Sequence, residues 1–315
     1  MEPIIAPVSA KIIEKELTPS KFVRKTNNAG NELYIIDHIN SPNIITEIGR
    51  LRELSFRRAG GGTGKNIDLD DFDTSDEPYK QLIVWDPKHR EILGGYRFYI
   101  PPADKPLNPQ RFATSRLFNF SDEFTSNYLP YLIELGRSFV QPAYQSTARA
   151  RKGVFALDNL WDGLGAIMVD NPKMKYFFGK VTMYKWFNRE ARNLILYFLQ
   201  KHFPDPDELV RPMDPLELNI DVAELEKVFY GNNYKADYKI LSHRVRNLSE
   251  VIPPLINAYM NLSPSMKVFG TVINKSFGDV EETGIMITMN DLYEKKVNRH
   301  VSTYQRVRYY IRKKP

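Results

Sequence analysis

The chain has 315 residues, of which 42% are hydrophobic, and it contains no cysteine. Such a chain can bury a large core in one long domain or two, while disulfides, thiolate zinc sites and cysteine nucleophiles are excluded. Its 44 Lys and Arg residues against 38 Asp and Glu residues give a net charge of +6, which suits an acidic protein, an anionic membrane surface or a nucleic acid as partner.

The N-terminal part of the chain is predicted to be an arm followed by the first regular elements. Prolines punctuate residues 1–30, which we expect to contain at most one short strand. Residues 32–38 form a short β-prone run. Ser41 and Pro42 then predict a helix start, because serine caps helices, proline fits the first turn, and apolar residues at helical spacing follow.

A glycine cluster and an acidic loop follow the predicted helix. The cluster at 60–65 is similar to a phosphate loop only in composition, because a P-loop requires a strand before it and a serine or threonine after its lysine. We therefore expect a substrate-gating loop here in preference to a nucleotide site. The carboxylates of residues 68–76 form either a solvated loop or a cation or amine site built from Asp73 and Asp76.

Residues 81–86 and 91–100 predict a β-hairpin across a turn at Pro87. Arg97 lies inside the second strand, between two aromatic residues. Because so many carboxylates are near it in the sequence, we expect this arginine to be paired.

The segment 132–142 is predicted to be a buried strand that carries two opposite charges, Glu134 and Arg137. Burial of either charge is costly unless it finds a partner. Residues three apart face opposite sides of a regular strand, so a bulge at Gly136 is needed to bring both side chains to one site. Such a bulge would also open the sheet. An internal salt bridge in an ordinary strand is the alternative.

A basic polar loop follows this strand and leads into a predicted helix at 154–169. A strand, a loop and a helix start together form an anion cradle, in which backbone N–H groups and the positive end of the helix face the ligand. A solvated basic loop is the alternative. The residues predicted to bind a phosphate in this cradle are Gln145, Arg149, Arg151, Lys152 and Gly153.

The rest of the chain is predicted to complete a single domain over residues 31–293. Residues 204–250 are polar and punctuated by proline, and we interpret them as an insertion over the core. Residues 294–315 are predicted to be a basic tail, either frayed or attracted to an anionic membrane surface. The other predicted elements are a strand at 175–183, helices at 186–203 and 253–262, and strands at 266–274 and 284–290 paired across 275–282.

The charged residues occur in an order that resembles a known enzyme family. The segments are RELSF at 52–56, DFDTSD at 71–76, YR at 96–97 and ELGR at 134–137. Together they resemble the acyl-homoserine-lactone (autoinducer) synthases, whose pattern is R-x-x-x-F, E-F-D-x-x-D, a strand arginine and E-x-x-R.

Other segments are more similar to a sister family, the ornithine- and glycine-lipid N-acyltransferases, often labelled hemolysin-like. These segments are ELGRS at 134–138 with Pro142 and Tyr144, LWDGL at 160–164, YFFG at 176–179 and IPPLINAY at 252–259. The triple glycine before the acidic loop and the absence of a tryptophan within it depart from the autoinducer pattern. These departures disfavour S-adenosylmethionine as the acceptor and favour a small amino acid.

The resemblance implies a GNAT acyltransferase fold of the α/β (α+β) class, with a central mixed, mostly antiparallel sheet split between two neighbouring strands and flanked by helices. It implies an N-acyltransferase that moves a fatty acyl chain from an acyl carrier protein or coenzyme A thioester to the amine of glycine or ornithine in aminolipid synthesis. The alternatives are an autoinducer-type synthase and a non-catalytic GNAT-fold module that binds a lipid or a partner.

N-acylation requires a deprotonated amine, a polarised carbonyl and a thiolate that can leave. In this interpretation Glu134 is the base, backbone N–H groups near Phe139 polarise the carbonyl, and Tyr184 protonates the thiolate. A salt-bridge network that only shapes the fold is the alternative. The implied catalytic residues are Glu134, Arg137, Asp73, Asp76 and Tyr184, and the implied substrate-binding residues are Arg52, Phe56, Arg97, Ser138, Phe139 and Val140.

The expected partners are an acyl carrier protein and an amino-acid acceptor. The expected co-substrate is an acyl thioester of acyl carrier protein or of coenzyme A. We expect no tightly bound cofactor, no metal and no nucleic acid, because the basic residues show no aromatic–basic repeat. Residues 1–10 lack the basic start and apolar run of a signal peptide. We therefore expect a cytoplasmic protein, with peripheral contact at the inner face of the membrane as one option.

Overall fold

The computed structural model describes residues 1–144, 150–218, 221–231 and 233–305. The α-helices are α1 (Ala10–Glu16), α2 (Pro42–Arg58), α3 (Asp71–Thr74), α4 (Ala150–Asp170), α5 (Arg189–His202), α6 (Val222–Val228), α7 (Tyr234–Asn247), α8 (Pro254–Met260) and α9 (Glu294–Lys296). The strands are β1 (Phe22–Lys25), β2 (Glu32–Ile36), β3 (Lys80–Asp86), β4 (Glu91–Tyr99), β5 (Phe118–Phe120), β6 (Leu132–Val140), β7 (Tyr176–Met183), β8 (Val210–Pro212), β9 (Lys267–Asn274) and β10 (Val280–Thr288).

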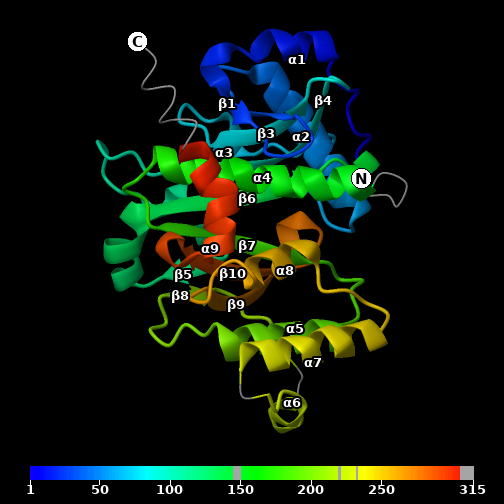
Figure 1. The fold of residues 1–315 in the computed structure, drawn as a ribbon, viewed down its shortest axis with the longest axis vertical. Helices are drawn as coiled ribbons and strands as arrows, with labels where there is room; N and C mark the ends of the chain where they lie inside the picture. The colour runs from blue at the N-terminus through cyan, green and yellow to red at the C-terminus, as the bar shows by residue number, and fades with distance from the viewer. Residues whose placement is uncertain (145–149, 219–220, 232, 306–315) are drawn as a thin grey trace.

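A large mixed sheet forms the centre of the described chain (Figure 1). Its strand order is β1-β2-β3-β4-β6-β7-β10-β9, and every neighbouring pair is antiparallel except β6 and β7, which run parallel. The strands β5 and β8 form a separate antiparallel pair. The predicted mixed, mostly antiparallel sheet flanked by helices is therefore confirmed.

The sheet opens between β6 and β7, as predicted. The parallel ladder joins Leu132–Leu135 to Tyr176–Gly179 and ends there. Beyond this point β6 continues beside β4, and β7 continues beside β10, without described pairing between β6 and β7. The two inner edges of the split are thus available to a ligand, as edge strands are.

A one-residue bulge in β6 accompanies the split. Gly95 pairs with Phe139 and Arg97 pairs with Gly136, so β6 has one residue more than β4 between these two positions. The left-handed backbone belongs to Arg137, with φ of 49°, and not to Gly136. Because the bulge reverses the alternation of side chains, Glu134 and Arg137 face the same side of the sheet.

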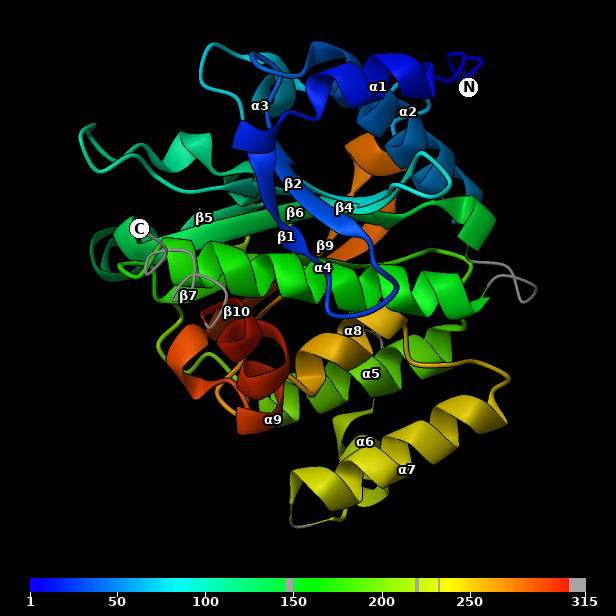
Figure 2. The same ribbon diagram turned by 45° about the horizontal axis from the view of Figure 1, so that its top comes forward.

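Helices cover both faces of the sheet (Figures 1 and 2). On one face α4, α5 and α8 pack the largest hydrophobic core, with Leu160 and Ile195 among its fully buried members. On the other face α2 packs over β3 and β6, and residues 109–131 pack over β7 and β10. The split therefore lies between two helical layers.

The predicted insertion belongs to the packed body. Its helix α7 lies against α5 (Figure 2), and Asp237 of α7 is fully buried. The Asp237 carboxylate lies 2.9 Å from both the Lys201 Nζ and the His202 Nε2, and it accepts the Gly231 N–H. Residues 204–250 thus extend the core around α5.

Both ends of the chain carry more structure than the sequence predicts. The N-terminal arm contains α1 as well as the edge strand β1. Residues 294–305 pack against α4 instead of forming a free tail, and the buried His300 ring nitrogen lies 2.8 Å from the Asp162 carboxylate of α4. The basic residues of the tail beyond Gln305 lie outside the described residues.

The start of α2 differs from its predicted cap. Pro42 occupies the first turn as expected, but the Ser41 side chain does not cap the helix. Instead, the Glu16 carboxylate at the end of α1 accepts the backbone N–H groups of Asn43 and Ile44 at 3.2 and 2.9 Å. A carboxylate also favours the positive end of a helix, so α1 stabilises α2.

Replacement of Gly179 by alanine should weaken the β6–β7 junction. A Cβ atom at this position would overlap the carbonyl oxygen of Leu135, the last partner in the parallel ladder. We expect Gly179→Ala to lower the free energy of unfolding by about 1–3 kcal/mol, measured by urea denaturation.

Gly136→Ala is the matched control, because a Cβ there meets no described atom within 4 Å. We expect it to change the free energy of unfolding by no more than about 0.5 kcal/mol. Equal effects of the two substitutions would contradict the proposed close approach at Gly179.

Candidate functional site

A cavity of about 550 Å³ passes through the split. Phe56 of α2 borders it on one side of the sheet, while Tyr144 and Leu255 border it from the core on the other side. The sequence-predicted residues that line it are Phe56, Arg97, Glu134, Arg137, Ser138, Phe139, Val140 and Tyr184. The cavity thus brings together most of the residues predicted for catalysis and substrate binding.

Three other predicted residues, Arg52, Asp73 and Asp76, do not line this cavity. Arg52 and Asp73 are fully buried beside it, and Asp76 is exposed on the loop after α3. The ammonium site predicted from Asp73 and Asp76 is therefore not formed, because the two carboxylates lie in different environments. Gln145 and Arg149 lie outside the described residues; Arg151, Lys152 and Gly153 belong to the start of α4, and their side chains are likewise outside the description.

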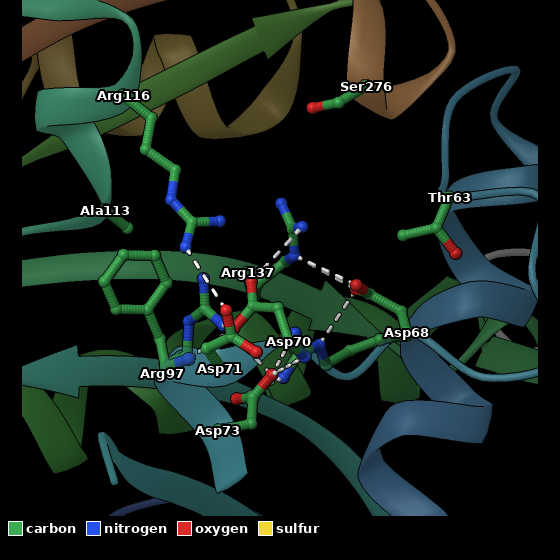
Figure 3. A network of polar contacts seen from close by, with 12 residues as sticks. Thr63, Asp68, Asp70, Asp71, Asp73, Arg97, Ala113, Arg116, Arg137 and Ser276 are labelled. Atoms are coloured by element: carbon green, nitrogen blue, oxygen red, sulfur yellow. Dashed lines mark hydrogen bonds and ion pairs between the residues drawn. The ribbon is translucent and has the colours of Figure 1, made fainter. Parts of the chain in front are cut away.

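A buried network of ion pairs between arginines and aspartates lies beside the bulge of β6 (Figure 3). The helical spacing of α2 turns Arg52 into the core, where it is completely buried. Its Nε donates to Asp68 at 3.0 Å, and its two terminal nitrogens donate to both oxygens of Asp73 at 3.0 and 3.1 Å. This bidentate pairing is the strongest geometry available to a guanidinium and a carboxylate.

Arg97 and Arg137 extend the same network to the cavity wall. The Arg97 Nη1 donates to Asp70 at 2.6 Å and to Asp73 at 3.0 Å. The Arg137 Nε lies 3.1 Å from an Asp68 oxygen, and its guanidinium stacks 4.0 Å above the centre of the Phe277 ring. Both arginines are thus already paired with aspartates, as the sequence predicts for Arg97.

The network keeps its aspartates ionised. Burial by itself raises the pKa of Asp68, but the charges of Arg137, Arg52 and Arg97 outweigh it and hold the pKa below its ordinary value. Burial likewise raises the pKa of Asp73, and Arg52 and Arg97 lower it well below its ordinary value. The carboxylates therefore act as permanent partners of the three arginines.

Glu134 lines the cavity but is engaged by neighbouring donors. One oxygen accepts the Tyr79 hydroxyl at 2.5 Å and the Ala113 N–H at 2.8 Å, and the other accepts the Thr114 N–H at 2.7 Å. Three donors already occupy the Glu134 carboxylate. Glu134 is therefore better suited to hold the backbone of residues 113–114 beside the cavity than to accept a proton.

Tyr184 lies at the other end of the cavity, beside the glycine cluster. Its ring stacks on Trp186 with a centroid distance of 6.2 Å and an interplanar angle of 1°. Burial, with the nearby charge of Glu282, raises the pKa of Tyr184 to about 12. The phenol is therefore neutral at physiological pH and remains a hydrogen-bond donor.

The glycine cluster is held in place, contrary to the expectation of a gating loop. The buried Glu53 carboxylate accepts the N–H groups of Thr63 and Gly64 at 2.9 Å, together with the Arg57 guanidinium. Gly62 has φ of 90°, and a Cβ there would contact this carboxylate. Because a helix precedes the loop, the P-loop alternative is not supported either.

The sequence analysis missed two charged residues of the cavity, Lys180 and Glu282. It assigned Glu282 to a loop at 275–282, but β10 begins at Val280 and carries Glu282 in the sheet. Lys180 lies inside the predicted strand at 175–183, and within β7 it is the one charged residue among apolar, small and polar neighbours. A lone lysine in a buried strand is the signal that could have identified it.

Among the described residues, one group has metal-ligand geometry: potential ligand atoms of Asp86, His89 and Glu91 lie within 4.8 Å of one another. The Asp86 carboxylate accepts the N–H groups of Lys88 and His89, so it already serves the turn between β3 and β4. These residues do not line the cavity.

In the parts of the chain that the structure describes, no helix is long and apolar enough to cross a membrane.

The network predicts how stability responds to acid. The folded-state pKa values of Asp68 and Asp73 lie below their unfolded values. The contribution of these two carboxylates to the free energy of unfolding is therefore fully present above about pH 4, and it is lost as the pH falls through the folded-state pKa values. Asp73→Asn should lower the free energy of unfolding at neutral pH by about 3–5 kcal/mol, since it leaves Arg52 incompletely paired. It should also flatten the acid dependence, measured by urea denaturation between about pH 2.5 and pH 7.

Asp76→Asn is the control from the same segment, since Asp76 is exposed. We expect it to leave the acid dependence unchanged and the free energy of unfolding within about 0.5 kcal/mol of the unmodified protein. An acid dependence that Asp73→Asn does not alter would show that the network does not carry it.

Comparisons with known proteins agree with this geometry. Residues 51–152 match the acetyltransferase (GNAT) domain. The chain is 54% identical over 307 residues to glycine N(alpha)-acyltransferase of Phocaeicola vulgatus, covering 96% of this chain and 94% of that protein. It is also 54% identical over 310 residues to glycine N(alpha)-acyltransferase of Bacteroides thetaiotaomicron, covering 96% of this chain and 91% of that protein.

Two solved structures show a more distant similarity. A CoA-dependent acyl-homoserine lactone synthase, BjaI, aligns with a TM-score of 0.31 and 16% identity over 52% of this chain and 72% of its own. The acyl-homoserine lactone synthase LasI aligns with a TM-score of 0.31 and 12% identity over 49% and 74%. These values are too low to support an inference about activity. The sequence identity over nearly the whole chain shows that the protein belongs to the family of the glycine N(alpha)-acyltransferases, enzymes with a GNAT domain that acylate an amino acid.

Proposed function

We propose that this N-acyltransferase moves a fatty acyl chain from a phosphopantetheine thioester to the amine of glycine. The observation that carries the proposal is the cavity of about 550 Å³ that passes through the split between β6 and β7. Inside the protein, this cavity places the unpaired edge of β6 next to charged side chains such as Lys180 and Glu282. The names of the two relatives support glycine as the acceptor. The product, an N-acylglycine, is the lyso-form of an aminolipid.

The acyl donor would lie along the open edge of β6. A pantetheine arm carries amide groups that can pair with an exposed strand edge, as peptides do. The helix α4 begins ten residues after β6 ends, and its positive N-terminal end is suited to the phosphate at the other end of the arm. Acyl carrier protein and coenzyme A share this phosphopantetheine and are both anionic, so the net charge of +6 suits either donor.

The reaction balances with groups of the cavity. The ammonium first loses a proton, and the lone pair of the resulting amine attacks the thioester carbon to form the C–N bond. Backbone N–H groups of β6 between Gly136 and Val140 stabilise the negative charge on the carbonyl oxygen. The acylated nitrogen then loses its second proton, the C–S bond breaks, and the thiolate takes a proton from the Tyr184 hydroxyl. The proton released by the nitrogen restores the phenol through solvent.

The proton of the ammonium needs an acceptor, and two carboxylates line the cavity, Glu134 and Glu282. Glu134 was the base predicted from the sequence. Because the Tyr79 hydroxyl and two backbone N–H groups already engage it, we propose that Glu134 positions the 113–114 segment. Glu282 accepts one described side-chain amide, from Asn274 at 3.2 Å, and is the better placed acceptor.

Product analysis tests the proposal. We expect the purified protein, given palmitoyl-acyl carrier protein or palmitoyl-coenzyme A and an equimolar mixture of amino acids, to form N-palmitoylglycine, detected by mass spectrometry. Incubation without protein is the control. A product on another amino acid would overturn glycine as the acceptor, and release of free fatty acid alone would overturn acyl transfer to an amine.

Substitution of Tyr184 tests the leaving-group assignment. Tyr184→Phe retains the ring that stacks on Trp186 but removes the proton donor. We expect kcat to fall by about 10²-fold or more, with a smaller change in the KM for glycine, measured by release of free thiol. Because the pKa of Tyr184 is raised to about 12, the unmodified enzyme should show no loss of activity from this group at moderately alkaline pH. An unchanged kcat in the variant would contradict the assignment.

A further inference from the structure

Lys180 and Glu282 form an oppositely charged pair on the wall of the cavity. They lie on the neighbouring strands β7 and β10, where Thr182 is opposite Glu282 and Gly284 is opposite Lys180. The two charged side chains are therefore diagonal neighbours on one face of the sheet. The Lys180 Nζ lies 3.9 Å from a Glu282 oxygen, and their side chains are 16% and 5% exposed.

This pair differs from the other charges around the cavity. Arg97 and Arg137 each lie within 3.1 Å of an aspartate oxygen, whereas the ammonium of Lys180 has Glu282 at 3.9 Å as its one partner among the described residues. An ammonium has three donors, and a carboxylate has about four acceptor sites. At 3.9 Å both groups retain hydrogen-bonding capacity. The attraction between the two charges therefore compensates the cost of their burial only in part.

We propose that Lys180 and Glu282 are the recognition site for a zwitterionic α-amino acid, with Lys180 binding its carboxylate and Glu282 binding its ammonium. The proposal rests on the N-acyltransferase function and deepens it, because it assigns the acceptor side of the reaction. An α-amino acid carries both charges on adjacent groups, so it can give each member of the pair an opposite charge.

The same contact provides the missing proton acceptor. One ammonium proton passes to the Glu282 carboxylate, and the amine then has the lone pair that attacks the thioester carbon. Tyr184 directly follows β7, two residues beyond Thr182, and both residues line the cavity. The amine and the leaving sulfur are thereby placed beside Glu282 and Tyr184.

The test compares glycine with glycinamide, which retains the amine but has no carboxylate. For Lys180→Met we expect the KM for glycine to rise by about 10-fold or more, since a charge-assisted hydrogen bond is lost. The preference for glycine over glycinamide in kcat/KM should fall by the same factor, and the KM for the acyl donor should not change. Lys180→Arg should recover part of the preference, because it keeps the positive charge.

The control for Lys180→Met is Lys275→Met. Lys275 also lies 3.9 Å from a carboxylate, that of Asp214, but both side chains are about four-fifths exposed and neither lines the cavity. We expect this variant to retain the kinetic constants of the unmodified protein. Thermal unfolding of each variant excludes loss of folded protein as the cause of a change.

Glu282→Gln tests the proton acceptor against Glu134→Gln. We expect Glu282→Gln to lower kcat by about 10²-fold or more and to remove the acidic limb of the pH profile of kcat/KM. Glu134→Gln should lower thermal stability but keep the acidic limb. Loss of the limb in Glu134→Gln alone would overturn the assignment of Glu282.

The two levels of the proposal fail in different ways. An unmodified protein that forms N-acylglycine, together with an unchanged glycine-to-glycinamide preference in Lys180→Met, overturns the recognition site and leaves the proposed function intact. An unmodified protein that acylates another α-amino acid overturns glycine as the acceptor. The pair is then tested with that amino acid and its amide, where loss of preference in Lys180→Met supports it and an unchanged preference overturns it.

Discussion

The site depends on the point where hydrogen bonding between β6 and β7 ends, at Leu135 and Gly179. Up to this point the two strands are parallel neighbours in an eight-stranded sheet. Beyond it they separate, and the cavity occupies the space between them. A strand edge in the interior of a protein must find partners for its backbone groups, and a ligand with amides and a carbonyl can supply them. A ligand bound in the split can therefore pair with backbone groups that β6 and β7 do not pair with each other.

The ion network explains how the bulge at the split is held. Arg137 has a left-handed backbone, which is strained for a residue with a side chain, and its guanidinium is held by Asp68 and by the Phe277 ring. Asp68 also pairs with the fully buried Arg52 of α2. The helix and the bulge therefore share one carboxylate. In this arrangement the three arginines and their aspartates satisfy one another's charges and shape the cavity wall.

Two sides of the cavity provide different chemistry. The bulged strand β6 presents backbone, which suits a thioester arm that must be bound without regard to its acyl chain. The strands β7 and β10 present Lys180, Thr182 and Glu282, and Tyr184 follows directly after β7; this side suits a small charged acceptor. The glycine cluster, held by Glu53, packs against the β7 side near Tyr184 and Trp186. The reacting atoms would meet where these two sides face each other.

The sequence by itself determined the elements that local periodicity specifies: the β3–β4 hairpin, the helix α2, and a central strand with two charges and a bulge. Its motifs also indicated the family, because they preserve residue type and order. Only the tertiary structure decided which charges meet. Asp68 and Asp70, and not Asp76, pair with the cavity arginines, and Glu282 meets Lys180 because β10 begins at Val280 and pairs with β7 in one particular register. Partners across strands depend on register and on strand limits, which long-range packing sets and which a pattern along the chain does not contain.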